Sequence, residues 1–168
     1  MLASILEEVA HSERLWTGVA MLPDGRIFVC FPYWFDDSHA SVTELMPDGS
    51  QEPFPDAIWN SRCGDPENHF VCVQSVVTDR KGYLWVLDTG NPLFAGIKEG
   101  GAKLLKFDAR DGKLLLRIVY SDPVILPDTY LNDVRIDTER NVAYLTDSGA
   151  GAIIVTDPVE HGQSSSLG

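Results

Sequence analysis

The same phrase is written three times in the chain, as Trp16-Thr-Gly-Val-Ala-Met-Leu-Pro-Asp-Gly-Arg-Ile-Phe-Val-Cys30, Gln74-Ser-Val-Val-Thr-Asp-Arg-Lys-Gly-Tyr-Leu-Trp-Val-Leu-Asp88 and Asn132-Asp-Val-Arg-Ile-Asp-Thr-Glu-Arg-Asn-Val-Ala-Tyr-Leu-Thr-Asp147. Each copy reads as an apolar strand, a tight turn and a second apolar strand. Gly25 and Gly82 are 57 residues apart, and Asp79 and Asp137 are 58 residues apart. A strand–turn–strand unit repeated at such an interval is typical of a radial β array. The repeat therefore predicts an all-β fold of the β-propeller type.

Each unit is expected to supply four antiparallel strands. They are predicted at residues 18–22, 26–31, 41–45 and 50–54, then at 75–78, 83–87, 103–107 and 113–120, and in the third unit as two repeat strands followed by 152–156. No segment favours a helix. A β-sandwich and an up-and-down barrel also contain short strands, but neither explains a phrase that recurs at this spacing. We therefore favour the propeller.

The chain is expected to hold about two and a half to three blades. We divide it into an amino-terminal extension (1–14), a partial propeller (15–157, with blades at about 15–58, 72–121 and 130–157) and a polar tail (158–168) in a truncated blade. A closed ring needs roughly 4–8 blades. Either the chain is the amino-terminal part of a longer propeller, which a break inside a blade favours, or self-association of two copies completes one ring.

The charge and the apolar content of the chain limit the classes of partner that it is expected to bind. The 168 residues carry a formal net charge of −12, and no cluster of Lys and Arg is visible. Phosphate backbones are bound by concentrated basic surfaces, so we expect no nucleic-acid partner. No apolar stretch approaches the length of a membrane span, so we expect no membrane partner either. The first ten residues lack a basic region and contain Glu7-Glu8, which argues against a secretory signal.

The three cysteines do not form a recognisable disulfide or metal motif. Cys30 and Cys72 lie in or beside apolar strands, which favours buried free thiols. A single disulfide between Cys63 and Cys72 is the alternative in an oxidising compartment.

A set of motifs in fixed order resembles the major royal jelly protein / Yellow family, in a form similar to its bacterial members, which are described as dopachrome tautomerase-related. The motifs are Thr17-Gly-Val-Ala20, Trp59-Asn60, Leu84-Trp-Val-Leu-Asp-Thr-Gly90, Tyr130-Leu-Asn-Asp-Val-Arg-Ile-Asp137 and Ala143-Tyr-Leu-Thr-Asp-Ser-Gly149. The resemblance implies a six-bladed propeller about twice this long. Relatives are typically secreted and include pigmentation proteins and salivary amine binders. The resemblance supplies no catalytic residues, so it leaves enzymatic activity open.

A more distant resemblance is to the gluconolactonase / senescence marker protein propellers, which hold a divalent cation on the axis. Asn132-Asp133 stands at the start of an inner strand and suits that role. The matching pairs, Thr17-Gly18 and Gln74-Ser75, are poor metal ligands. No cofactor is evident from the residues themselves, and Ca²⁺ or another divalent cation stays an alternative.

The inner strands of a propeller all begin on one face, around the central channel. We therefore expect Thr17, Gln74, Asn132 and Asp133 to converge there and to contact a small-molecule ligand. The loops at 32–40, 88–101 and 147–151 open on the same face. For Asn132 and Asp133 the alternative is structural, because Asx side chains often cap turns or tie neighbouring segments together.

Aromatic and acidic residues gather in the first of these loops. Tyr33, Trp34 and Asp36 could form a wall for a cationic or aromatic ligand. The alternative is that some of these rings pack between blades, and strand alternation allows both roles. Asp88-Thr-Gly90 and Asp147-Ser-Gly149 repeat each other and are interpreted as structural corners, while Trp59-Asn60 is interpreted as packing between blades.

Three hypotheses for function follow. The first is a small-molecule-binding propeller whose ligand is an aromatic amine or a related metabolite. The alternative is an enzyme, either a metal-assisted lactonase or a dopachrome-type isomerase. The third is a secreted structural or storage protein. No HExxH motif and no nucleophile elbow occurs in the sequence, so a zinc hydrolase and a serine hydrolase have no support.

Overall fold

Residues 7–35 and 39–157 are described by a computed structural model. Blade 1 contains β1 (Gly18–Met21), β2 (Ile27–Cys30), β3 (Val42–Leu45) and β4 (Gln51–Pro53). Blade 2 contains β5 (Val73–Thr78), β6 (Tyr83–Asp88), β7 (Lys103–Asp108) and β8 (Leu114–Val119). Blade 3 contains β9 (Leu131–Asp137), β10 (Val142–Asp147) and β11 (Ala152–Thr156). Two short 3₁₀ turns, η1 (Pro66–Asn68) and η2 (Pro92–Phe94), lie in loops of the described part.

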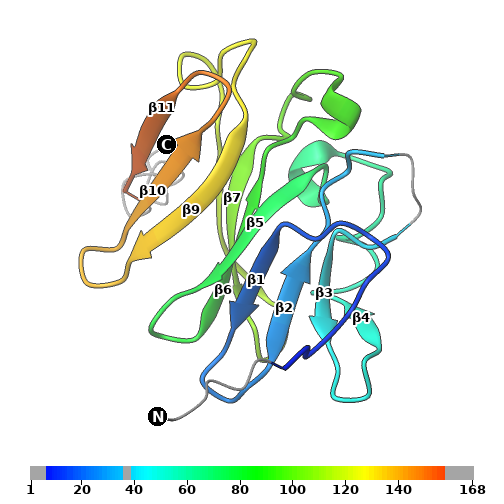
Figure 1. Cartoon of the computed structure of the whole chain (residues 1–168). Helices are drawn as coiled ribbons and strands as arrows, with labels where there is room; N and C mark the ends of the chain where they lie inside the picture. Colours follow the sequence, from blue (N-terminus) through cyan, green and yellow to red (C-terminus); the bar gives the residue numbers. More distant parts are fainter. Residues whose placement is uncertain (1–6, 36–38, 158–168) are drawn as a thin grey trace, which may run out of the picture.

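The three sheets are antiparallel and stand side by side as propeller blades (Figure 1). Each sheet is ordered as its strands follow along the chain, and the first strand of each blade contacts the first strand of the next, β1 against β5 and β5 against β9. The all-β propeller fold is therefore confirmed. The predicted strands are all present, and β5 begins two residues earlier than expected because Val73 pairs with Asp88 beyond a bulge.

The tight turn between the first and second strands contains a residue with positive φ in all three blades. Gly25 and Gly82 adopt φ values of 90° and 81°, in the region that glycine enters without steric cost. The third blade places Asn141 there, with φ 54°. Asn tolerates the left-handed region better than most residues, so the turn survives without glycine.

The hydrophobic core lies between blades, and the middle blade contributes to both halves of it. Leu84 and Val86 of β6 pack in a cluster shared with blade 1, whereas Trp85 and Leu87 pack in a cluster shared with blade 3. Successive residues of a strand point to opposite faces, which accounts for this division. Burial between neighbouring blades, repeated twice, holds the array together.

Some expectations concern residues outside the described ranges. These are the first six residues of the amino-terminal extension, Asp36 and the tail at 158–168. Within the described ranges, no helix has the length and apolar character needed to cross a membrane.

Candidate functional site

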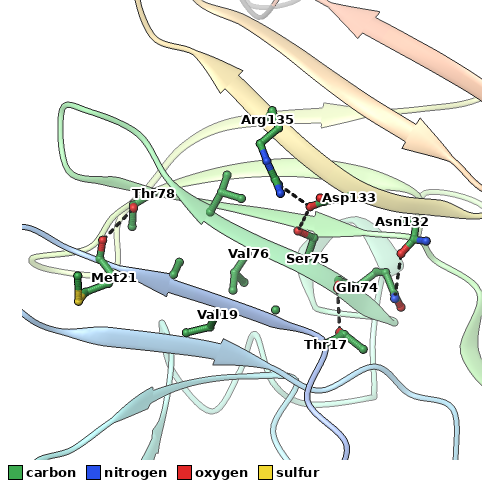
Figure 2. A pocket seen from close by; sticks show the side chains of 13 residues that line it. Thr17, Val19, Met21, Gln74, Ser75, Val76, Thr78, Asn132, Asp133 and Arg135 are labelled. Atoms are coloured by element: carbon green, nitrogen blue, oxygen red, sulfur yellow. Dashed lines mark hydrogen bonds and ion pairs between the residues drawn. The ribbon is translucent and has the colours of Figure 1, made fainter. Parts of the chain in front are cut away.

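The starts of the three inner strands line a groove of about 630 Å³ on the axial side of the blades. Thr17, Gln74, Asn132 and Asp133 all border it, as the repeat predicted. Figure 2 shows Thr17, Gln74 and Asn132 at the same end of β1, β5 and β9. The structure thus brings together residues that are far apart in the sequence but equivalent in the repeat.

Hydrogen bonds connect these residues from blade to blade. The Thr17 hydroxyl donates to the main-chain oxygen of Gln74 at 2.8 Å, and Gln74 Nε2 donates to Asn132 Oδ1 at 3.2 Å (Figure 2). Gln74 is buried, whereas Thr17 is exposed and Asn132 is half-buried. The groove therefore has a continuous polar wall across three blades.

The carboxylate of Asp133 accepts hydrogen bonds from its own blade and from the preceding blade. Its Oδ1 accepts hydrogen bonds from the Ser75 hydroxyl, the Val134 amide and Arg135 Nη1, each at 2.8 Å. The predicted structural role of Asp133, tying adjacent blades together, matches this geometry. Among residues 7–35 and 39–157, no group of three or more His, Cys, Asp or Glu side chains is placed to hold a metal ion. The Ca²⁺ hypothesis therefore stays a prediction.

An aromatic stack, with one ring associated with each blade, adjoins the groove through a hydrogen bond between Tyr130 and Gln74. The ring of Phe94 stacks against both Trp34 and Tyr130, with centroids 6.0 Å and 5.8 Å away and interplanar angles of 23° and 20°. Trp34 comes from the β2–β3 loop, Phe94 from the β6–β7 loop, and Tyr130 immediately precedes β9. We refer to these three residues as the aromatic stack.

The Tyr130 hydroxyl joins the aromatic stack to the polar groove. It accepts a hydrogen bond from Trp34 Nε1 at 2.7 Å and donates one to Gln74 Oε1 at 2.9 Å. Burial raises the pKa of Tyr130 to about 12, so the phenol stays protonated and keeps donating through the physiological range. Three hydrogen bonds therefore form one connected network of side chains, which runs through Trp34, Tyr130, Gln74 and Asn132.

The backbone that presents Phe94 is unusual. Leu93 and Phe94 both have left-handed conformations, with φ values of 56° and 55°. Bulky residues rarely adopt this region, and such strain persists only where surrounding contacts impose it. One such contact is the hydrogen bond from the Leu93 amide to the Tyr33 main-chain oxygen at 2.7 Å. The loop of blade 2 is thereby held against the loop of blade 1.

The aromatic run of blade 1 divides between packing and exposure. Phe31 is buried, Phe35 is exposed, and Tyr33 lies under the guanidinium of Arg62, whose Cζ is 3.6 Å from the ring centroid. Trp34 alone of the run joins the aromatic stack in the described structure. Packing is thus observed for Phe31, whereas a ligand-binding role for Tyr33 and Trp34 stays a prediction.

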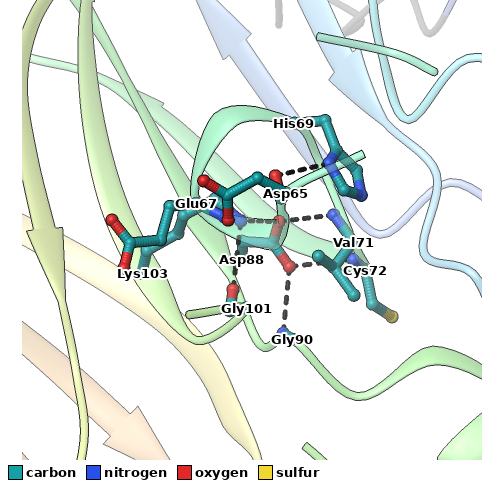
Figure 3. Close-up of polar contacts among 9 residues, drawn as sticks. All are labelled: Asp65, Glu67, His69, Val71, Cys72, Asp88, Gly90, Gly101 and Lys103. Atoms are coloured by element: carbon teal, nitrogen blue, oxygen red, sulfur yellow. Dashed lines mark hydrogen bonds and ion pairs between the residues drawn. The ribbon is translucent and has the colours of Figure 1, made fainter. Parts of the chain in front are cut away.

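Asp88, the last residue of β6, forms a buried corner of blade 2. The carboxylate of Asp88 accepts the amides of Val71 and Cys72 at 2.7 and 2.8 Å, the amide of Gly90 at 2.9 Å, and Lys103 Nζ at 2.8 Å (Figure 3). Both charged side chains are fully buried. The structural role predicted for Asp88-Thr-Gly90 is confirmed, and the buried Lys103 is a partner that sequence reasoning missed.

The equivalent corner of blade 3 fixes the backbone of the aromatic stack. Asp147 Oδ1 accepts the amide of Tyr130 at 2.8 Å and the amides of Gly149 and Ala150 at 3.0 Å. Burial acts to raise the pKa of Asp147, but these amides and Thr129 outweigh it, and the pKa lies below its usual value. The second repeat of the corner is therefore structural as predicted, and it also positions Tyr130.

The remaining expectations concern packing. Trp59 contacts Phe70 and Phe107 in the core between blades 1 and 2, and Asn60 Oδ1 accepts the amides of Ser41 and Val42. The predicted packing between blades is confirmed for Trp59, whereas Asn60 holds backbone groups of blade 1.

The thiols follow the burial expected of them. Cys30 and Cys72 are buried free thiols, and Cys63 is an exposed free thiol. Burial raises the pKa of Cys30 to about 11 and that of Cys72 to about 12.

The sequence profile described as Major royal jelly protein matches residues 71–163. The chain belongs to the major royal jelly protein family. Protein yellow of Drosophila erecta is 30% identical over 146 residues, an alignment that covers 76% of this chain and 26% of the relative. Protein yellow of Drosophila melanogaster is 30% identical over 142 residues with the same coverage. This family member thus spans about a quarter of the length of the curated relatives it matches.

Two solved structures show the fold that this member of the major royal jelly protein family shares with distant proteins. YCF48 bound to D1 peptide has a TM-score of 0.52 at 14% identity, covering 89% of this chain and 39% of that one. A luciferin-regenerating enzyme has a TM-score of 0.52 at 15% identity, covering 95% and 43%. At these identities the likeness concerns the fold alone.

Proposed function

We propose that this chain binds a small organic molecule of the aromatic amine class at the axial face, between the aromatic stack and the polar groove. The observation that carries the proposal is the Tyr130 hydroxyl, which connects Trp34 to Gln74 within hydrogen-bond distance of both. An aromatic surface and a row of amide groups thereby meet at one place. The three stack residues do not line the groove itself and adjoin it through this hydroxyl. A ligand held at the junction would meet an apolar surface on one side and a few convergent polar groups on the other, which is the usual design of a ligand site.

Each part of an aromatic amine finds a suitable surface here. Phe94 is 61% exposed, so its outer edge and the adjoining stack can contact a ligand ring. The faces of the three rings attract a cation. The amide oxygens of Gln74 and Asn132 each accept one hydrogen bond in the structure and have a second lone pair for an ammonium group. The net charge of −12 favours the approach of a cation over that of an anion.

Packing between blades does not account for the aromatic stack. Phe70 and Phe107, which pack between blades, are fully buried in the core cluster, and Trp59 packs against that same cluster while half-buried. Trp34, Phe94 and Tyr130 belong to neither core cluster and remain partly accessible. Aromatic side chains that are ordered by stacking and hydrogen bonds yet left accessible are better suited to binding than to core formation.

Among the described residues, no arrangement favours the lactonase or the isomerase hypothesis. Asp133, the axial carboxylate, is engaged by Ser75 and Arg135. We therefore propose binding and assign no reaction.

The test is a calorimetric titration with tryptamine. Saturable binding is expected, and tryptophol, in which a hydroxyl replaces the amine, should bind more weakly because it lacks the cation. Phe94→Ala should weaken tryptamine binding by roughly tenfold, which corresponds to about 1.4 kcal/mol. Phe35→Ala is the matched control, since this Phe is 63% exposed but outside the aromatic stack.

Two outcomes would contradict the proposal. One is the absence of saturable binding for tryptamine, dopamine and related amines. The other is an equal loss of affinity in Phe94→Ala and Phe35→Ala, because the stack would then have no special part in binding.

A further inference from the structure

The β6–β7 loop of blade 2 has a base that is fixed by packing and by hydrogen bonds. The Lys98 amide donates to the main-chain oxygen of Gly90 at 2.9 Å, which closes the loop on itself. Pro92 is buried, and Ile97 packs against the core cluster between blades 2 and 3. Blade 2 has a neighbouring blade on each side, so the position of this loop depends on contacts within the described structure.

The tip of the same loop, residues 93–96, is exposed, and we call it the flap. Leu93 is 45% exposed and Phe94 is 61% exposed, although both side chains are large and apolar. Neither residue belongs to a core cluster. The flap is therefore not anchored by core packing, in contrast to the base of the loop.

Contacts with the neighbouring blades hold the flap in the observed position. The Leu93 amide donates to the main-chain oxygen of Tyr33 at 2.7 Å. The ring of Phe94 stacks against both Trp34 and Tyr130. The amides of residues 95 and 96 donate to groups of the same loop, so they do not tie the flap to another blade.

The backbone conformation of the flap opposes these contacts. Leu93 and Phe94 have φ values of 56° and 55°, and bulky residues rarely adopt this left-handed region because it is sterically unfavourable. The cost of two such residues is of the same order as the gain from one hydrogen bond and two ring contacts. A second arrangement, in which both residues return to negative φ and Phe94 leaves the stack, therefore lies close in free energy.

We propose that the flap opens and closes at the aromatic stack, and that Leu93 is the positioning residue that sets the balance between the two forms. The observed form is the closed one. In the open form, the ring faces of Trp34 and Tyr130 that Phe94 covers are accessible, so a ligand can enter there. The flap then closes on the ligand, as loops at binding sites commonly do.

The coupling of the flap to a ligand rests on the proposed function. In that proposal a ligand ring contacts the outer edge of Phe94, and this contact exists only when the flap is closed. A ligand that binds one of two forms better shifts the equilibrium toward that form. Tryptamine should therefore favour the closed flap.

Hydrogen exchange of main-chain amides, followed by NMR on the full chain, tests the flap without any ligand. The Leu93 amide should be protected at least roughly tenfold less than the Lys98 amide, because opening the flap exposes only the former. Leu93→Asn should raise the protection factor at position 93 several-fold, since Asn tolerates positive φ. Leu93→Val should lower it by a similar factor, since a β-branched side chain fits that region least. Lys98 should be unaffected in both variants.

Two results would overturn the flap. One is the same protection factor at position 93 in the unaltered chain, Leu93→Asn and Leu93→Val. The other is equal protection of position 93 and Lys98 in all three proteins, because the loop would then open only when the whole fold unfolds.

The same measurement with saturating tryptamine separates the flap from the proposed function. Protection at position 93 should rise several-fold while that of Lys98 stays constant. Saturable tryptamine binding that leaves position 93 unchanged would overturn the coupling. Absence of tryptamine binding would contradict the proposed function and the coupling that rests on it, whereas the two Leu93 variants would still decide the flap.

Discussion

The hydroxyl of Ser75 in β5 donates to Asp133 in β9 at 2.8 Å, and the two residues are 58 positions apart, one length of the repeat. Thr78 donates in the same way to the main-chain oxygen of Met21, 57 positions earlier. Equivalent positions of successive blades thus become neighbours along the axis. Hydrogen bonds between residues one repeat apart in the sequence therefore join neighbouring blades.

The bond between Ser75 and Asp133 should contribute measurably to stability. Ser75→Ala should lower the free energy of unfolding by about 1 kcal/mol, the usual net value of a hydrogen bond. In a double-mutant cycle with Asp133→Ala, the coupling energy should be about 0.5–1 kcal/mol, since the residues are in direct contact. Urea denaturation of the four proteins measures it. A coupling energy of zero would show that the blades are held without this contact.

The Asp88–Lys103 pair should be among the most sensitive points of the fold. Asp88→Asn leaves a buried ammonium group without its counter-charge and should cost about 3–5 kcal/mol of unfolding free energy. Asp88→Asn combined with Lys103→Met should be less destabilising than Asp88→Asn alone, because no uncompensated charge then remains. Chemical denaturation tests both, and a double variant less stable than the single one would refute the explanation.

Asp147 provides the comparison, since it accepts backbone amides at the equivalent corner without a buried cation. Asp147→Asn should cost only about 1–3 kcal/mol through weakened amide contacts. Because the pKa of Asp147 is lowered in the folded protein, its contribution is present above the unfolded pKa and is lost as pH falls through the folded value. Acid denaturation of Asp147→Asn should therefore be shallower than that of the unaltered chain.

The turn residue with positive φ, which occurs in all three blades, can be tested by adding a side chain at one blade and by removing one at another. Gly82→Ala should cost about 1 kcal/mol, because alanine is strained at φ 81° although nothing obstructs its side chain. Asn141→Gly should be neutral within about 0.5 kcal/mol, since glycine relieves strain at φ 54° but gains freedom in the unfolded chain. Equal melting temperatures for Gly82→Ala and the unaltered chain would contradict the role of the positive φ.

The strands and the axial positions were predictable because both follow the repeat. Thr17, Gln74 and Asn132 converge as expected, since the same place in each blade faces the axis. The aromatic stack was not predictable in the same way. Its members lie in loops that do not follow the repeat. Phe94 adopts a left-handed conformation that its residue type does not indicate, because it is not a glycine. The burial of Lys103 was not predicted, because the ammonium group of a lysine in a strand usually reaches solvent. Here it pairs with the buried carboxylate of Asp88.

Alkaline pH should destabilise the fold through its buried thiols. Burial raises the pKa of Cys30 to about 11 and, together with the charge of Asp88, that of Cys72 to about 12, whereas an unfolded thiol has a pKa of about 8.5. Above pH ~9 the unfolded state has lost protons that the folded state retains, so stability falls as pH rises through the folded values.

The midpoint of urea denaturation between pH 8.5 and pH 10.5 measures this fall. Cys72→Ala should make the dependence on pH shallower, whatever its effect on stability at pH 8.5. Cys63→Ala, which alters an exposed thiol, should keep the slope of the unaltered chain. If all three proteins have the same slope, buried thiols do not cause the alkaline loss.

The indole N–H resonances of the four tryptophans, followed by NMR during titration with tryptamine, test the central claim most directly. Trp34 donates its indole N–H to Tyr130 within the aromatic stack, whereas Trp59 and Trp85 pack between blades. With Trp34 assigned by Trp34→Phe, its resonance should shift in a saturable manner while those of Trp59 and Trp85 stay in place. An unmoved Trp34 resonance at saturating tryptamine, or equal shifts of all four, would contradict binding at the axial face.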